Sequence, residues 1–221
     1  MTDIFHEVQE EIRRERLQRV WTRYGWLIVA VVTLAVLGVG AWRGYEYYAA
    51  HQAQAAGDRY QAAARLATEG KDEEARAAFA ALAADGPAGY RAVARLREAA
   101  LLTESDPAAA ITAYEAIAND STLDGLLRDA ARVRAAYVAV DAASRDEVRR
   151  LVEPLAVDNG GWRHAAREAL GLAAYKAGDV ADARRQFEAL MSDDDTPQGA
   201  RQRAELMLAV MPPPAAADGA K

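Results

Sequence analysis

The sequence predicts an all-α protein in which one N-terminal transmembrane helix is followed by an α-solenoid of stacked helix pairs. Residues 24–42 contain no charged side chain, and a pattern of apolar positions recurs further along at intervals of 35 to 38 residues. No stretch shows the alternation of apolar and polar residues that is typical of a half-buried strand. These observations favour helices throughout the chain.

The apolar stretch, YGWLIVAVVTLAVLGVGAW, lies between Arg23 and Arg43. A helix of this length would extend about 28 Å, close to the roughly 30 Å hydrocarbon core of a bilayer. Trp and Tyr side chains flank both ends, where such residues anchor a helix in the membrane interface. Residues 24–42 are therefore predicted to span a membrane. The alternative is a buried helix of a soluble domain, although such helices usually keep a polar face.

The basic residues predict the orientation of this helix. Residues 1–23 contain five Arg, whereas the twenty residues after the span contain only Arg43 and Arg59. Because basic residues favour the cytoplasmic side, the N-terminus is expected in the cytoplasm and the C-terminal part outside it. Cleavage after Val39-Gly40-Ala41 is the alternative. An uncleaved anchor is favoured because the leading region is long and as acidic as it is basic.

Two shorter features accompany the span. Residues 1–23 are predicted to be a cytosolic amphipathic segment, with an apolar helix face that begins at Phe5 and Val8. This segment would lie at the membrane surface or dock onto a cytosolic protein. Gly40 and Gly44 have the small-xxx-small spacing that lets two transmembrane helices approach closely, so they are predicted to be packing residues.

A repeated pattern fills most of the remaining chain, with copies that begin at Gly70, Ser105, Ala143 and Ala177. One aligned column holds a large apolar residue in three copies, the column four residues earlier holds Ala in three copies, and the column three residues later holds Leu or Ile. These columns are Phe79, Tyr114, Val152 and Phe187; Ala75, Ala110, Val148 and Ala183; and Leu82, Ile117, Leu155 and Leu190. Each later copy follows a second helical segment with an Ala-Arg pair.

A helix pair about every 34 residues, with small residues where helices cross and a large residue beside them, is the tetratricopeptide pattern. One pair cannot bury its apolar stripe alone, so neighbouring pairs stack. Residues 43–211 are predicted to form this repeat domain, its first helix running on from the span to about Glu69. Residues 212–221 begin with three Pro and are predicted to be a disordered tail. The third copy departs from the pattern at Val148 and Val152.

No residue set in the sequence is a candidate for catalysis. The chain has no Cys, and His6, His51 and His164 lie far apart without a HExxH motif. Asp193–Asp195 lacks the ligand spacing of a calcium loop. We therefore expect no metal, no cofactor and no enzymatic activity. The net charge of −6 and the lack of a basic stripe exclude nucleic acid as an expected partner.

The remaining candidate is a protein-binding surface. In stacked helix pairs, the first helix of each pair usually lines the concave face, and Arg and aromatic residues are the commonest hot spots at interfaces. The alternative for each such residue is an ordinary position on a solvated helix face, paired with nearby Glu and Asp. The residues predicted to bind protein on this face are Tyr90, Arg91, Arg95, Arg128, Arg132, Trp162, Arg163 and Arg167.

The run Leu37-Gly38-Val39-Gly40-Ala41, followed by Trp42-Arg43, Tyr45 and His51-Gln52, resembles the ancillary SecYEG translocon subunit family (the YfgM-like proteins). Gly89-Tyr90 with Leu96, Ala99 and Ala100, and Gly178-Asp179 with Ala183, are similar to its repeat region. The resemblance implies a single-pass protein of the bacterial inner membrane with a periplasmic, tetratricopeptide-like domain. It also implies partners: translocon subunits, a membrane-anchored periplasmic chaperone and newly exported chains.

The sequence therefore favours a non-catalytic, membrane-anchored adaptor that binds proteins at the translocon or among periplasmic chaperones. An envelope scaffold for cell division or for wall or outer-membrane assembly is an alternative with the same architecture. A self-assembling structural protein is another, in which the Gly pair and the repeat surface would form a homo-oligomer. The third alternative is an enzyme.

Overall fold

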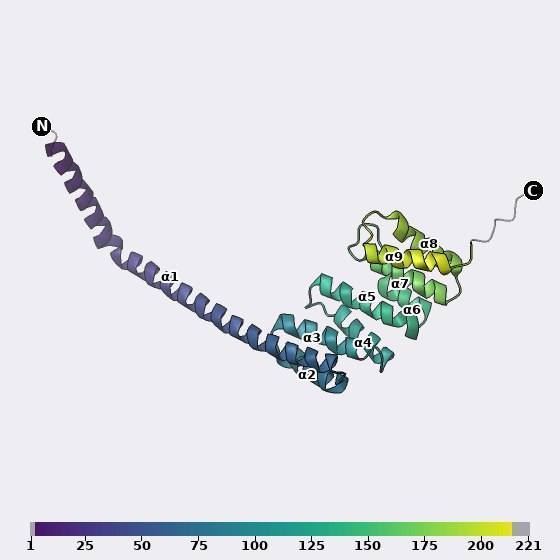
Figure 1. Cartoon of the computed structure of the whole chain (residues 1–221). Coiled ribbons are helices and arrows are strands. Elements are labelled where there is room, and N and C mark those ends of the chain that lie inside the picture. The colour runs from purple at the N-terminus through teal and green to yellow at the C-terminus, as the bar shows by residue number, and fades with distance from the viewer. Residues whose placement is uncertain (1–2, 214–221) are drawn as a thin grey trace, which may run out of the picture. The chain divides into compact units, whose positions relative to one another are not determined.

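The computed structural model describes residues 3–213, with side chains from residue 21 onward except that of residue 28. Within this range every regular element is a helix, which confirms the predicted all-α fold class (Figure 1). The elements are α1 (Asp3–Thr68), α2 (Asp72–Asp85), α3 (Ala88–Leu101), α4 (Pro107–Ala118), α5 (Gly125–Ala142), α6 (Arg145–Val152), the 3-10 helix η1 (Glu153–Leu155), α7 (Arg163–Lys176), α8 (Val180–Ser192) and α9 (Gln198–Val210).

The chain divides into two compact units, Met1–Ala55 and Ala56–Lys221. The predicted boundaries at residues 23 and 42 mark the ends of the membrane span, and the boundary at residue 211 marks the start of the disordered tail. These boundaries stay predictions. Most of the predicted disordered tail, residues 214–221, lies outside the described residues, as do the side chains on which the predicted amphipathic face of residues 1–23 depends.

In the first unit, residues 24–42 form part of α1, which is long and apolar enough to cross a membrane by its length and composition. Its large apolar side chains are exposed, from 46% for Leu27 to 69% for Leu34. Trp21, Trp26 and Trp42 are exposed as well. An exposed apolar surface of this size is unfavourable in water and favourable against lipid.

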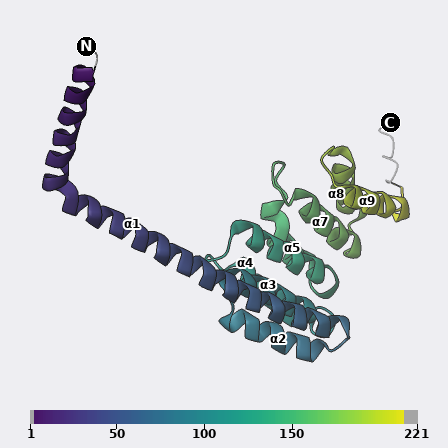
Figure 2. The same ribbon diagram turned by 60° about the vertical axis from the view of Figure 1, so that its left-hand side comes forward.

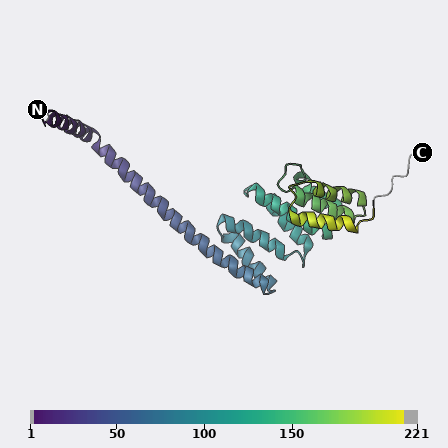
Figure 3. The ribbon, with the colours of Figure 1, turned by 45° about the horizontal axis from the view of Figure 1, so that its top comes forward.

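The second unit is a stack of helices that follow one another in chain order, with α2 near one end and α9 at the other (Figures 2 and 3). The last turns of α1 belong to this stack, because Ala56 and Ala63 share a buried cluster with Phe79 and Leu82 of α2 and Ala94 of α3. Helix pairing therefore begins before the first copy that the sequence alignment identifies.

The aligned sequence columns form the core. Every residue of the large-residue and Ala columns is at most 2% exposed, which includes Val148 and Val152 of the divergent third copy. Leu155 differs from the other members of its column, because it is only partly buried. The cause is Pro154, which has no backbone N–H to donate and therefore cannot continue the helix. Helix α6 ends at Val152, and Leu155 falls in the 3-10 turn.

A further column of small residues lies on the first helix of each pair, and the sequence alignment missed it. Its members are fully or almost fully buried and lie 11 or 12 residues before the Ala column. They are Ala63, Ala99, Ala136 and Gly171. Small side chains at these positions allow the two helices of a pair to cross closely, and the large residue fills the space beside the crossing.

Glycine ends the first helix in two of the pairs. Gly70 has φ +74° and Gly178 has φ +80°, a left-handed conformation that Gly adopts at little cost. At both turns the backbone forms the two reciprocal hydrogen bonds of a Schellman motif, for example from Gly178 N–H to the Tyr175 carbonyl and from Asp179 N–H to the Ala174 carbonyl, each 3.0 Å. The next helix then begins directly.

Polar contacts join equivalent helices of successive pairs. Arg150 of α6 donates to Glu115 of α4 at 2.6 Å, and Arg203 of α9 donates to Glu168 of α7 at 2.5 and 2.8 Å. In each contact the two residues are 35 positions apart, which is one repeat. The stacking period seen in the sequence is thus also the period of these ion pairs.

Candidate functional site

An Arg on the first helix of a pair repeatedly contacts an Asp at or just beyond the C-terminal end of the second helix. Nη2 of Arg59 lies 2.8 Å from Oδ1 of Asp85, and Nη1 of Arg95 lies 2.6 Å from Oδ2 of Asp120. The third example is Arg163, whose Nε donates to Asp193 at 2.7 Å. In three helix pairs, an ion pair thus joins the first helix to the C-terminal end of the second.

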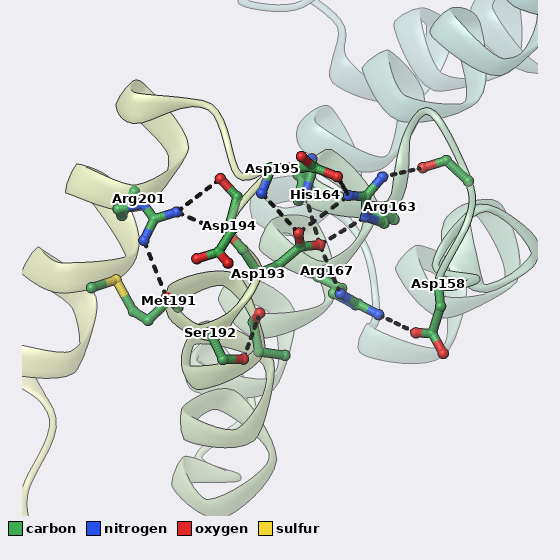
Figure 4. A network of polar contacts seen from close by, with 12 residues as sticks. Asp158, Arg163, His164, Arg167, Met191, Ser192, Asp193, Asp194, Asp195 and Arg201 are labelled. Carbon is green, nitrogen blue, oxygen red and sulfur yellow. Dashed lines mark hydrogen bonds and ion pairs between the residues drawn. The ribbon is translucent and has the colours of Figure 1, made fainter.

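The most extensive contact of this kind surrounds Asp193, which follows α8 (Figure 4). Its carboxylate accepts hydrogen bonds from Arg163 Nε at 2.7 Å and from the backbone N–H of Asp195 at 3.1 Å, and lies 3.0 Å from His164 Nε2. Arg167 lies 3.7 Å away on the next turn of α7. The hydrogen bond from Arg163 is the largest cause that holds the pKa of Asp193 well below its usual range.

Four of the eight residues predicted to bind protein form ion pairs within the domain. Arg95 and Arg163 bind Asp120 and Asp193 as above, Arg132 lies 2.8 Å from Asp129, and Arg167 lies 2.6 Å from Asp158. These contacts balance the charges of the four Arg side chains within the domain, as in the alternative of a solvated position paired with nearby Glu and Asp.

The other four predicted residues lie in different surroundings. Tyr90 is half-buried and its ring centroid is 6.3 Å from that of Tyr60, so it packs on the end of α1. Arg91 is exposed, and Arg128 is half-buried with an Nε that has no hydrogen-bond partner. Trp162 is half-buried at the start of α7. That these eight residues bind protein stays a prediction.

Gly40 and Gly44 lie in open surroundings on α1. A Cβ added at either position would meet no atom of the described chain within 4 Å. Their predicted role in transmembrane packing therefore concerns another molecule, and it too stays a prediction.

A surface groove of about 1080 Å³ lies in the second unit, between the end of α3, the body of α5 and the start of α7. Trp162 is the predicted residue that lines it. Its full lining comprises Asp72, Ala100, Leu101, Thr103, Glu104, Pro107, Tyr114, Val133, Arg134, Tyr137, Val138, Asp141, Ala142, Trp162 and Ala165.

Sequence reasoning missed most of this groove. Arg134, Tyr137 and Asp141 share one face of α5, at positions i, i+3 and i+7. That spacing, combined with a Tyr on the first helix of a pair, is a signal from which the face could have been found. The Ala-Arg pairs lie on a different face of the same helices.

The groove has an apolar and aromatic interior. Tyr114 and Val133 are 2% and 5% exposed. Burial raises the pKa of Tyr114, so its hydroxyl stays protonated at neutral pH. The half-buried Tyr137 and Trp162 present aromatic side chains at this groove, and Tyr and Trp are residue types on which binding energy often concentrates at protein interfaces.

A hydrogen bond to α7 holds the Tyr137 side chain in place. Its hydroxyl donates to Oε2 of Glu168 at 3.0 Å, and the buried Glu168 accepts two more hydrogen bonds from Arg203. Burial, followed by the charge of Glu168, raises the pKa of Tyr137. Helices α5, α7 and α9 are thereby linked through one carboxylate. These contacts hold the side chain of Tyr137 in one position at the groove.

Comparisons with known proteins agree with this architecture. A family model described as "Tetratricopeptide repeat-like domain" matches residues 18–209. The chain is 29% identical over 171 residues to the "Ancillary SecYEG translocon subunit" of Escherichia coli (strain K12), a match that covers 76% of this chain and 82% of that protein. This similarity confirms the resemblance found in the sequence. No solved structure matches the chain.

The family model covers most of the chain, including the buried columns on α2, α4, α6 and α8. The chain therefore belongs to the tetratricopeptide repeat-like family.

Proposed function

We propose that this chain is a non-catalytic adaptor, anchored in the bacterial inner membrane by residues 24–42, whose repeat domain lies in the periplasm and binds proteins beside the Sec translocon. Its partners would be translocon subunits, a membrane-anchored periplasmic chaperone and newly exported chains. The groove between α3, α5 and α7 is the observation that supports a binding role. The similarity to the translocon subunit of E. coli supports the location.

The exposed apolar surface of α1 supports the anchor. Large apolar side chains from Leu27 to Val39 have no other role in the described chain, and each favours insertion by about 0.3–0.6 kcal/mol. Trp21, Trp26 and Trp42 are placed to anchor the two interfaces. The excess of Arg before the span supports a cytoplasmic N-terminus.

The groove and the eight predicted face residues supply the binding surface in this proposal. Trp162 belongs to both sets. Arg91 is exposed and is the predicted residue most accessible to a partner. Gly40 and Gly44 would bring α1 close to a neighbouring transmembrane helix, either of the translocon or of a second copy.

Purification from native membranes tests the proposal. The full chain, tagged after Lys221 and extracted in mild nonionic detergent, is expected to recover translocon subunits. A matched bait that carries only residues 1–42 shares the anchor but lacks the repeat domain, and it is expected to recover fewer. Equal recovery by both baits, or recovery by neither, would contradict the adaptor role of the repeat domain.

A further inference from the structure

Three carboxylates border the groove without an ion pair. Asp72 begins α2, Glu104 lies in the turn after α3, and Asp141 lies near the end of α5. All three are exposed, and none of their carboxylates has a hydrogen bond or ion pair within residues 21–213. Among the described lining residues, Arg134 is the single one with a positive charge.

This charge pattern differs from that at the ends of three helix pairs. Asp85, Asp120 and Asp193 each accept a hydrogen bond from an Arg, so their charges are balanced internally. The carboxylates of the groove are not balanced in this way. Clefts lined mainly by one sign of charge focus the electric field and attract ligands of the opposite charge.

The position of Lys176 makes the two ends of the groove differ in how strongly they attract a cation. Its ammonium group donates to the backbone carbonyls of Val140 and Asp141 at 2.8 and 2.6 Å. The positive charge beside Asp141 weakens the negative potential at that end. Neither Asp72 nor Glu104 contacts a Lys or Arg side chain in this way within residues 21–213, so these two residues carry the larger share of the preference.

The aromatic wall adds a second requirement. Tyr137 and Trp162, which are both half-buried, line the same groove beside the almost fully buried Tyr114. Aromatic faces favour apolar side chains, and they also attract the cationic head groups of Lys and Arg by about 0.5–1 kcal/mol at exposed sites. A ligand that satisfies both features is a chain with basic side chains next to apolar ones.

We propose that this groove binds an extended, basic segment of another protein, with Lys or Arg side chains at Asp72 and Glu104 and an apolar side chain against Trp162. The inference rests on the proposed function for the claim that the domain binds proteins at all. It adds the chemical class of the bound segment and the groove that takes it.

Binding of labelled peptides tests this assignment. The full chain is placed in nanodiscs of phosphatidylcholine, which carries no net charge, and fluorescence anisotropy follows a short Lys/Leu peptide and a counterpart with Glu in place of Lys. The Lys peptide is expected to bind about tenfold more tightly, and its advantage should shrink as salt screens the exposed charges. Equal affinity for the two peptides would overturn the proposal.

Two triple variants with the same change in net charge assign the effect to the groove. The groove variant carries Asp72→Asn, Glu104→Gln and Asp141→Asn. The control carries Asp146→Asn, Glu153→Gln and Glu205→Gln, which replace exposed residues outside the groove that form no ion pair within residues 21–213. The groove variant should lose about tenfold in affinity for the Lys peptide, as expected for three exposed charge pairs, and the control should lose little. Equal losses would overturn the proposal.

Failure of this inference is distinguishable from failure of the proposed function. If the groove variant binds the Lys peptide as the natural chain does, the groove assignment is wrong, and recovery of translocon subunits from membranes would still support the adaptor role. If the Lys preference is present but no translocon subunit is recovered, the proposed location is wrong and the groove assignment stands.

Discussion

The ring of Phe187 lies against the backbone of Gly171, one helix away. A Cβ added to Gly171 would lie 2.9 Å from both Cε2 and Cζ of that ring and 3.2 Å from Cβ of Gln186. Helices α7 and α8 therefore cross at a distance that excludes a methyl group. The corresponding position of the other three pairs is a buried Ala, whose methyl group those crossings accommodate.

Replacing Gly171 with Ala should lower the free energy of unfolding by about 1–3 kcal/mol, the usual cost of an extra methyl group in a packed core. Urea unfolding of the full chain in mild nonionic detergent, followed by circular dichroism, measures this change. Gly89→Ala in α3 is the matched control, because its Cβ would meet nothing within 4 Å. A loss of stability of the same size in the control would contradict this account of the crossing.

Replacing Gly178 with Ala should cost about 1 kcal/mol for a different reason. A Cβ at Gly178 would contact nothing within 4 Å, so the cost comes from its φ of +80° alone. Gly178→Asn should recover part of the loss, because Asn tolerates the left-handed conformation better than Ala. Thermal unfolding of both variants tests this. If Asn is no better than Ala, the turn does not limit stability.

Removal of Glu168 should leave the Tyr137 hydroxyl without its partner inside the domain. Glu168→Ala is expected to lower the free energy of unfolding by about 1–3 kcal/mol, and Tyr137→Phe by about 1 kcal/mol. Both changes remove the same hydrogen bond between Tyr137 and Glu168. The double variant should therefore lose less stability than the sum of the two single losses. The same urea unfolding experiment completes this cycle. Strictly additive losses would show that the two residues act independently.

Asp120 should make stability depend on pH in the acid range. Hydrogen bonds from Thr122 and then Arg95 lower the pKa of Asp120 to about 2, below its usual value of about 3.9. The ionised form is thus favoured by folding, so the contribution is complete above about pH 4 and is lost as the pH falls toward 2. Asp120→Asn should therefore destabilise the chain at neutral pH, with a difference from the natural chain that disappears in acid. A difference independent of pH would contradict this explanation.

The proposed orientation predicts opposite results for two reporter fusions. Alkaline phosphatase is active only outside the cytoplasm, so it should be active when fused after Lys221 and inactive when fused after Arg23. Activity assays in intact cells, normalised to the amount of fusion protein, make this comparison. The reverse pattern would show that the repeat domain lies in the cytoplasm.

Much of the fold follows from the sequence because each repeat is a local unit. The spacing of Phe79, Tyr114 and Phe187 identifies the core positions without any knowledge of distant contacts. Pro154 also ends α6 by a local rule, although its effect on Leu155 was missed. Repeats thus reduce a fold to neighbouring contacts, which periodicity is able to reveal.

The surface could not be derived in the same way. Arg163 is predicted to bind protein, with a solvated position paired with a nearby acidic residue as the alternative, and the structure shows it beside Asp193, a residue 30 positions later in a connection without regular structure. Whether an Arg is free depends on such pairings, and residue type alone does not encode them. The groove likewise combines Asp72, Glu104 and Asp141 from separate elements, so only the folded chain brings their charges together.

Photocrosslinking in intact cells tests the central claim most directly. A photoreactive amino acid at position 141, in the groove, is compared with one at position 205, an exposed position on α9 outside it. The adaptor account predicts adducts from position 141 to translocon subunits, to a periplasmic chaperone or to exported chains, and few from position 205. Adducts from position 141 to cytosolic proteins, or no adducts from that position in a chain correctly inserted in the membrane, would contradict it.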